Sequence, residues 1–406
     1  MFSINAASAL EEKRFRGRER QGIARGQERQ PEKQGASLEE EYRGMSPEQQ
    51  FYHKPNGWTR KVMIIGRHGD TPKDEKTGGS LDMLLENSFG SVFEKSRRER
   101  ALLFGDEPIA HNEIRSITSP RKRTQQTTRA STVPFVKGRQ AYTPKNEKEL
   151  IERHGRDMER IQLTTTPLLD YEREVDGKKV PIANMRVYKE KNGAETIINH
   201  WMQNPTATEH RFKETKQEIK PYYQLYGELK SVLANGIATL LSTDTKVVDL
   251  RSHGTVVEPA LAVIAESGGA KIRNLADLGG EVPKEGYGVL VIDVDPKTQQ
   301  YRALLKVNNR IFQANIENIM NPEYNPHHPA SHMAGQQVSY DLDHEPSQQE
   351  LNEMQLQQQR GYETKPRSHE PKAKEEDVPA NRYKRYAGEE RRPLEREERY
   401  RQPAHK

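Results

Sequence analysis

The stretch that most constrains the fold is a short apolar run that ends in an arginine and a histidine. Val62 to Ile65 are apolar without alternation, and Gly66, Arg67 and His68 follow at once. Such a run is typical of a strand buried on both faces, as in a parallel sheet. Because ligands bind beyond the carboxyl ends of these strands, we expect Arg67 and His68 at a binding site. A guanidinium suits a phosphate group, and an imidazole nitrogen can attack one.

A second junction of the same kind follows residues 114–118, which read as a short strand. Ser119 and Pro120 end this run, and the next ten residues have the composition of a helix. We expect Ser119 to be the N-cap and Pro120 the first helical residue. Arg123 then lies in the first turn, beside a helix N-terminus that favours anions.

A third junction lies far along the chain. Residues 246–250 predict a strand, and Ser252, His253 and Gly254 follow it, before a predicted helix from about Glu258 to Glu266. Since all three junctions follow strands, we expect them to converge at one end of one sheet. The sequence therefore predicts an α/β fold, a three-layer sandwich with a mostly parallel central sheet.

Further periodicity supports this architecture. Tyr222 to Leu241 carry one apolar stripe at helical spacing. Residues 288–294 and 301–307 are apolar runs separated by a turn that contains Asp295 and Pro296, which predicts a closing hairpin. Residues 131–215 give a weaker pattern, with helical sequence near 148–158.

Composition limits how much of the chain folds. The 406 residues are 32% hydrophobic and 31% charged, with a mean hydropathy of -1.02, so a large part cannot bury a core. The polar, charged residues concentrate at both ends. We predict a charged, disordered N-terminal arm over residues 1–57, a catalytic domain over 58–315, and a polar, disordered C-terminal tail over 316–406.

Composition also excludes several classes of function. There is no cysteine, which rules out disulfides, thiolate nucleophiles and cysteine-bound metals. No stretch is apolar for long enough to span a bilayer, and no secretory signal is visible, so we predict a cytoplasmic protein without a membrane partner. The formal charge is 65 minus 60, or +5, which is too small to predict nucleic-acid binding.

The ordered set of motifs resembles the histidine phosphatase superfamily, which includes cofactor-dependent phosphoglycerate mutases. Arg67-His68-Gly69 matches its Arg-His-Gly signature, and residues 119–127 resemble its Ser-Pro-x-x-Arg-x-x-Gln-Thr element. Ser252-His253-Gly254 resembles its second His-Gly motif. Residues 150–155 are similar to the stretch that carries the acid, and Gly193-Ala-Glu-Thr196 to the element that follows. The resemblance covers roughly residues 61–310.

The resemblance implies a phosphomonoester hydrolase. His68 would attack phosphorus and form a phosphohistidine, while Arg67 and Arg123 would hold the phosphoryl oxygens. His253 would donate to a phosphoryl oxygen, and Glu152 would serve as acid and then as base. No metal and no cofactor are implied, and the substrate would be a phosphorylated small molecule or a phosphoprotein.

Two departures from the family pattern stand out. Asp74 lies where many relatives have an asparagine that touches the phosphate, and a carboxylate there would repel it. The stretch around Glu152 is one residue short, which leaves Asp170 or Glu172 as alternative acids.

Two other functions stay open on the sequence. One is a mutase on the same fold. The other is a degenerate phosphatase fold that binds phosphorylated ligands, with charged arms that bind other proteins.

Overall fold

The computed structural model describes residues 38–76, 81–175, 178–182, 194–212, 215–218, 220–328 and 339–341. All of them belong to one compact unit, Met1–Glu345, and residues 346–406 form a second unit outside the described part. The outer parts of the two predicted arms, residues 1–37 and 342–406, therefore lie outside the described residues. In the described part of the chain, none of the helices combines the length and apolarity needed to cross a bilayer.

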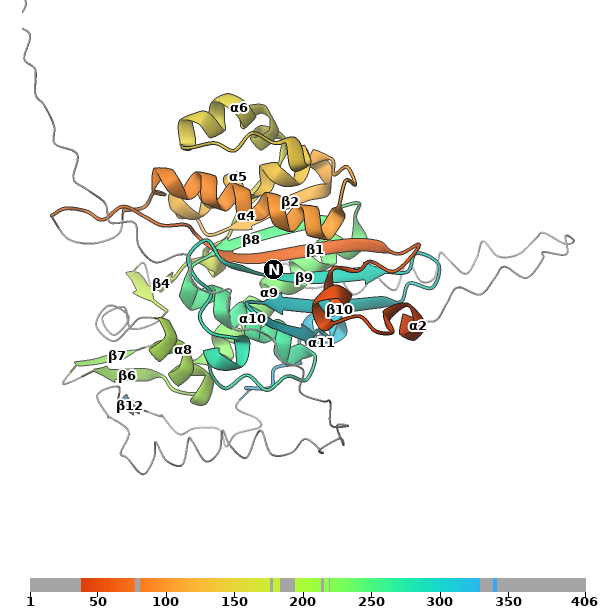
Figure 1. Ribbon diagram of the computed structural model, residues 1–406. Helices are drawn as coiled ribbons and strands as arrows, with labels where there is room; N and C mark the ends of the chain where they lie inside the picture. The colour runs from red at the N-terminus through yellow and green to blue at the C-terminus, as the bar shows by residue number, and fades with distance from the viewer. Residues whose placement is uncertain are drawn as a thin grey trace, which may run out of the picture. The chain divides into compact units, whose positions relative to one another are not determined.

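The core of the fold is a mixed sheet of seven strands in the order β11-β10-β9-β1-β8-β2-β3 (Figure 1). Four neighbouring strands run parallel, and three continue the sheet in antiparallel fashion. The parallel strands are β1 (Thr59–Arg67), β8 (Val247–Ser252), β2 (Ile114–Thr118) and β3 (Gln162–Thr165). The others are β9 (Tyr287–Val294), β10 (Tyr301–Val307) and β11 (Arg310–Gln313). The predicted α/β class, parallel core and closing hairpin are confirmed.

Helices cover both faces of this sheet, as the three-layer prediction requires (Figure 1). One layer contains α4 (Glu86–Phe104) and α5 (Lys122–Lys137), with α6 (Glu147–Arg160) packed on them. The other contains α9 (Tyr222–Ser242), α10 (Gly254–Ser267) and α11 (Ile316–Met320).

Smaller elements complete the described part. They are the helices α2 (Leu38–Tyr42), α3 (Pro47–Tyr52) and α8 (Ala194–Gln203), the hairpin β4 (Glu172–Val175) and β5 (Lys178–Pro181), and a small sheet of β6 (Glu209–Phe212), β7 (Thr215–Glu218) and β12 (Ser339–Asp341). Single 3-10 turns are η1 (His111–Glu113), η2 (Gly138–Gln140), η3 (Pro167–Leu169) and η4 (Leu275–Leu278).

The position of β1 explains why residues 62–65 in the middle of the strand are all apolar. Val62 and Ile64 pack in a cluster with Phe135 of α5, whereas Met63 and Ile65 pack in a second cluster with residues of α9 and α10. These four side chains are at most 1% exposed. Burial of one such side chain is worth about 1.5–3 kcal/mol, so the strand is fixed between both helical layers.

The register of the parallel strands aligns the three junctions. Arg67 at the end of β1 lies opposite Ser252 of β8, and Thr118 of β2 lies opposite Arg251. The residues that follow each strand therefore leave the sheet at the same end. The helix after β2 begins at Lys122 rather than at Pro120, with Arg121 as its N-cap, so the predicted start was two residues early.

The folded unit begins well before the predicted boundary at residue 58. Helix α3 starts with a capping box at Ser46, and its Phe51 is fully buried in the same cluster as Val62 and Ile64. The guanidinium of Arg60 also donates to the backbone carbonyls of Tyr52 and His53. Residues 46–57 read as a polar arm because most of them are polar, and Phe51 with the adjacent Tyr52 supplies their apolar contact with the core cluster.

The unit also continues beyond residue 315. Ile316 and Ile319 of α11 are buried in the cluster formed by α9 and α10. The ammonium of Lys230, 4% exposed, donates to the carbonyls of Asn321 and Pro322 and so attaches the next segment. The predicted domain limits 58–315 are therefore too narrow at both ends.

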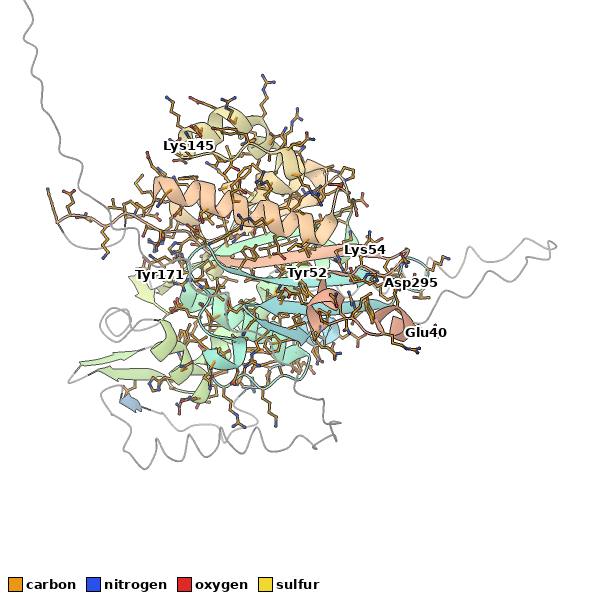
Figure 2. The ribbon with its side chains drawn as sticks, viewed as in Figure 1. Glu40, Tyr52, Lys54, Lys145, Tyr171 and Asp295 are labelled. Atoms are coloured by element: carbon orange, nitrogen blue, oxygen red, sulfur yellow. The ribbon has the colours of Figure 1, made fainter. Side chains whose placement is uncertain are left out.

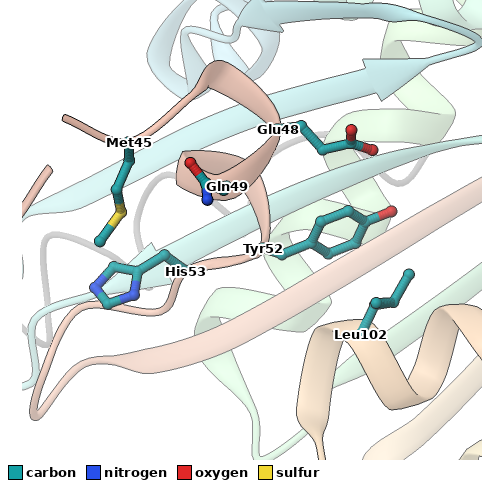
Figure 3. Close-up of a pocket in the computed structure, with 6 residues that line it drawn as sticks. All are labelled: Met45, Glu48, Gln49, Tyr52, His53 and Leu102. Carbon is teal, nitrogen blue, oxygen red and sulfur yellow. The ribbon is translucent and has the colours of Figure 1, made fainter.

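The N-terminal helices leave a pocket of about 520 Å³ between α3 and α4 (Figure 3). Met45, Tyr52 and His53 line it from one side, and Leu102 of α4 lines it from the other. It shares no lining residue with the three junctions.

The boundary correction can be tested at Phe51. We expect Phe51→Ala to lower the free energy of unfolding by about 3–5 kcal/mol, since it empties a fully buried aromatic site. Leu102→Ala, at a side chain 55% exposed, is the matched control and should change stability by less than about 0.5 kcal/mol. Chemical denaturation of both variants measures the difference. If both variants lost equally little stability, residues 46–57 would belong to the N-terminal arm and not to the folded unit.

Candidate functional site

The three junctions meet at the carboxyl end of β1, β8 and β2. Tyr171, just before β4, lies at this end of the sheet, whereas Lys54 and Asp295 lie at the opposite end (Figure 2). The rings of His68 and His253 lie with their centroids 5.1 Å apart, and the Tyr171 ring packs edge-on against His253 at 4.8 Å. The structure thus brings together the two histidines that the sequence placed after separate strands.

His68 has one ring nitrogen in use and one available. Its Nδ1 lies 2.7 Å from the backbone carbonyl oxygen of Gly69, so Nδ1 carries the hydrogen and donates it. That tautomer leaves the Nε2 lone pair for attack. Burial of the ring, and then the nearby charge of Arg123, lower the pKa of His68 to about 3, with a further contribution from Arg67. At neutral pH the imidazole is therefore uncharged.

His253 is almost completely buried. Among the described residues, its Nε2 has partners and its Nδ1 does not, which is the reverse of His68. Its Nε2 lies 3.2 Å from Ser119 Oγ and 3.6 Å from a carboxylate oxygen of Asp170. Its Nδ1 is buried and has no hydrogen-bond partner among the described residues. Burial, and then the neighbouring His68 and Arg123, hold the pKa of His253 well below its usual value. An uncharged His253 with Ser119 donating to Nε2 has an Nδ1 hydrogen to offer a ligand.

Arg67 is positioned by contacts on both sides of its guanidinium. Its Nη1 donates to Glu281 and to the carbonyl of Val282. Gly254, the first residue of α10, lies against the other part of the group, and a Cβ there would come within 2.8 Å of Arg67 Cζ. Glycine in the His-Gly motif therefore leaves room for the arginine.

Arg123 lies in the first turn of α5, where the sequence placed it, and is only 9% exposed. Its Nε makes no hydrogen bond to any described residue, although Asp82 lies 3.9 Å away. The backbone N–H groups of Lys122 and Arg123 also point at the Asp82 carboxylate, at 3.1 and 3.4 Å. Asp82 thus satisfies a helix N-terminus that an anion would otherwise bind.

Asp170 and Glu172 are the carboxylates that the structure adds to the cluster. Arg121 Nε donates to both oxygens of Asp170, at 3.1 and 2.9 Å, and Arg121 also binds Glu172. The Arg121 guanidinium stacks over the Tyr171 ring at 4.7 Å. Asp170 is 7% exposed and its carboxylate lies beside His253, so it belongs to the same buried cluster.

Glu152 is not part of this cluster. It lies on α6, which packs on the outside of α4 and α5. Its side chain is 57% exposed and pairs with Lys148 one helical turn away, at 3.9 Å. The role that the resemblance assigned to Glu152 therefore lacks a structural basis, because α6 holds its carboxylate in solvent.

The other predicted residues have more varied positions. Asp74 lies in the loop after His68 and accepts a hydrogen bond from the backbone N–H of Lys76 at 2.8 Å. Glu195 is the second residue of helix α8, and its side chain lies outside what the structure describes.

Sequence reasoning missed the role of Arg121 and gave Asp170 only as an alternative. Arg121 occupies a variable position of the Ser-Pro-x-x-Arg element, so its pattern gives no signal. Asp170 had one: it follows residues 162–165, a fourth parallel strand that the sequence did not predict because three of its four residues are polar. Recognising β3 would have added a fourth junction at the same end of the sheet.

Comparison with known proteins gives fold neighbours only. No family model matches the sequence, and no curated protein matches it either. A mycobacterial glucosyl-3-phosphoglycerate phosphatase in complex with VO3 is 15% identical over 62% of this chain and 99% of its own, with a TM-score of 0.34. The phosphoglycerate mutase of Bacillus anthracis is 10% identical over 66% of this chain and 98% of its own, with a TM-score of 0.32. A Klebsiella phytase is 12% identical over 67% of this chain and 86% of its own, with a TM-score of 0.30.

At these identities and TM-scores, the neighbours do not establish what this chain does. Its activity has to be argued from the residues of the site.

The contact between Gly254 and Arg67 gives a direct test of the site. We expect Gly254→Ala to weaken binding of inorganic phosphate by about tenfold or more, because the new methyl group must displace the Arg67 guanidinium. Isothermal titration calorimetry measures the affinity. Gly227→Ala is the control, since a Cβ at that helical position meets nothing within 4 Å. Unchanged phosphate affinity in Gly254→Ala would show that Arg67 does not bind the anion.

Proposed function

We propose that this protein hydrolyses a phosphomonoester through a phosphohistidine on His68. The observation that supports this most is the state of His68: an uncharged ring, with Nδ1 bonded to Gly69 and Nε2 free to attack. A buried histidine surrounded by arginines gains nothing structurally from this arrangement. Perturbed titratable groups of this kind concentrate at catalytic sites.

In the first step, the Nε2 lone pair of His68 forms a bond to phosphorus as the bond to the leaving oxygen breaks. Nδ1 keeps its hydrogen bond to the Gly69 carbonyl, which stabilises the positive charge that develops on the ring. Arg67 and Arg123 face the equatorial oxygens and balance their charge. His253 donates its Nδ1 hydrogen to one of them.

Asp170 replaces Glu152 as the proposed acid and base. It is the buried carboxylate beside His253, and its bond to Arg121 fixes its direction. It would give a proton to the leaving oxygen and then take one from the water that attacks phosphohistidine. This second step returns His68 to its neutral form and releases inorganic phosphate. Glu172, also bound to Arg121, is the second candidate for this role.

The proposed substrate is a phosphorylated small molecule or a phosphoprotein, turned over without a metal or another cofactor. The cytoplasmic location stays a prediction, as does the binding of other proteins by the arms. A mutase shares the first step, and it would need to protect the phosphohistidine from water. We infer hydrolysis because Asp170 offers a base for that water beside the histidines.

The covalent intermediate can be trapped. We expect phosphate to remain on His68 when the protein is denatured with alkali during turnover of para-nitrophenyl phosphate. Acid quenching would remove it, because phosphoimidazoles are acid-labile. Mass spectrometry of the digested protein locates it. His68→Ala should lose the adduct and at least about 10³-fold in rate, yet retain part of its phosphate affinity through Arg67 and Arg123. Turnover at the wild-type rate by His68→Ala would refute the mechanism.

The choice of acid can be decided by the leaving group. We expect Asp170→Asn to slow alkyl phosphate hydrolysis about a hundredfold more than aryl phosphate hydrolysis, because an alkoxide needs a proton and a phenolate does not. Glu152→Gln is the matched control and should leave both rates unchanged. Ratios of kcat/KM for the two substrates give the result. Equal losses in Asp170→Asn would assign it to holding Arg121, and Glu172→Gln would be tested next.

A further inference from the structure

A carboxyl group that the proposed chemistry does not use lies directly behind Arg67. Glu258, near the start of α10, is fully buried. Its Oε1 lies 3.6 Å from Arg67 Nη1 and accepts a hydrogen bond from the backbone N–H of Val282 at 3.2 Å. It therefore joins three parts of the site: helix α10, the end of β1, and the loop that follows η4.

The same nitrogen of Arg67 has further partners on that loop. Nη1 donates to the carbonyl of Val282 and to Glu281, whose side chain is 36% exposed. Three acceptors thus meet one end of the guanidinium, and only Glu258 among them is both charged when ionised and inaccessible to water. The arrangement fixes Arg67 from behind.

The protonation of Glu258 decides how much of the Arg67 charge is cancelled. Burial raises the pKa of Glu258 to about 8, although Arg67 opposes the shift and Glu281 adds to it. Its second oxygen is buried without a hydrogen-bond partner among the described residues, as suits a neutral group. At neutral pH, Glu258 therefore leaves the positive charge of Arg67 available to a ligand.

We propose that Glu258 is a positioning residue that fixes the Arg67 guanidinium and the following loop, and that its ionisation weakens the hold of Arg67 on a phosphoryl group. This rests on the proposed function only in that the cluster binds phosphate. The charged groups that face Glu258 are Arg67 from β1 and Glu281 from the loop after η4. As pH rises through about 8, a negative charge appears behind Arg67 and competes with the phosphoryl oxygens.

The experiment compares inorganic phosphate binding to the full-length wild type and to Glu258→Gln between pH 7 and pH 9.5. Glutamine keeps the shape and an oxygen acceptor for Val282, but it cannot ionise. The ratio of the two dissociation constants removes the titration of phosphate itself. We expect similar affinities at pH 7 and a wild type that is weaker by about tenfold at pH 9.5, the effect of one pKa unit of coupling.

Glu266→Gln is the matched control. Glu266 is also a buried carboxyl on α10 whose pKa burial raises, but its partner is His327 rather than Arg67. The ratio of the phosphate dissociation constants of Glu266→Gln and the wild type should stay constant over the same pH range. A merely structural effect of replacing a buried carboxyl would appear in both variants.

A measurement on the wild type avoids any folding defect of the variants. NMR of the protein with carboxyl-labelled glutamate follows the titration of each glutamate. The Glu258 signal is the one missing in Glu258→Gln, or the one that titrates at the most alkaline pH if that variant does not fold. Its midpoint should lie near pH 8. Saturating phosphate should raise that midpoint by about one unit, because coupling between two ligands is reciprocal.

The outcomes separate the two proposals. A constant ratio for Glu258→Gln, an unmoved midpoint, or no phosphate binding by the wild type would overturn the role of Glu258. The expected ratio in a protein that hydrolyses no phosphomonoester would support Glu258 as the positioning residue and refute the proposed hydrolase. Turnover of a phosphomonoester, together with a constant affinity ratio for Glu258→Gln, would support the proposed hydrolase and refute the role of Glu258.

Discussion

The burial of β1 on both faces determines where chemistry is possible in this protein. Val62 and Ile64 anchor the strand to one helical layer, and Met63 and Ile65 anchor it to the other. Arg67 follows this apolar run by two residues. The first polar side chains therefore lie at the end of a strand that packing on both faces holds in place. At that boundary the bond to the Gly69 carbonyl orients the His68 ring, while burial and the nearby Arg123 lower its pKa and keep it neutral.

Each arginine of the site is held by a carboxylate from a loop or a helix end. Glu281 lies on Arg67, Asp170 and Glu172 lie on Arg121, and Asp82 lies near Arg123, whereas Glu258 beside Arg67 is uncharged at neutral pH. This pairing stabilises three clustered guanidinium groups without a ligand, since like charges brought this close would otherwise repel one another. In the proposed function, a phosphoryl group would compete with these carboxylates for the guanidinium groups.

The limits of the folded unit show where sequence patterns lose information. Arg60 and Arg302 both bind Asp293, which is fully buried, and they donate to backbone carbonyls of residues 50–53. These contacts fix α3 through charged side chains and main-chain atoms. Hydrophobic periodicity cannot register them, because a buried arginine looks the same in sequence as a solvated one.

The sequence by itself determined the α/β class, the parallel core, and the convergence of Arg67, His68, Arg123 and His253, because apolar strands followed by polar junctions leave few other topologies. Only the tertiary structure decided which carboxylate joins them. Glu152 and Asp170 are equally polar in a weakly patterned region. The packing of α6 on the outer layer exposes the first, and the pairing of β3 with β2 delivers the second to the histidines. A residue's distance from a site depends on long-range packing, which local sequence does not encode.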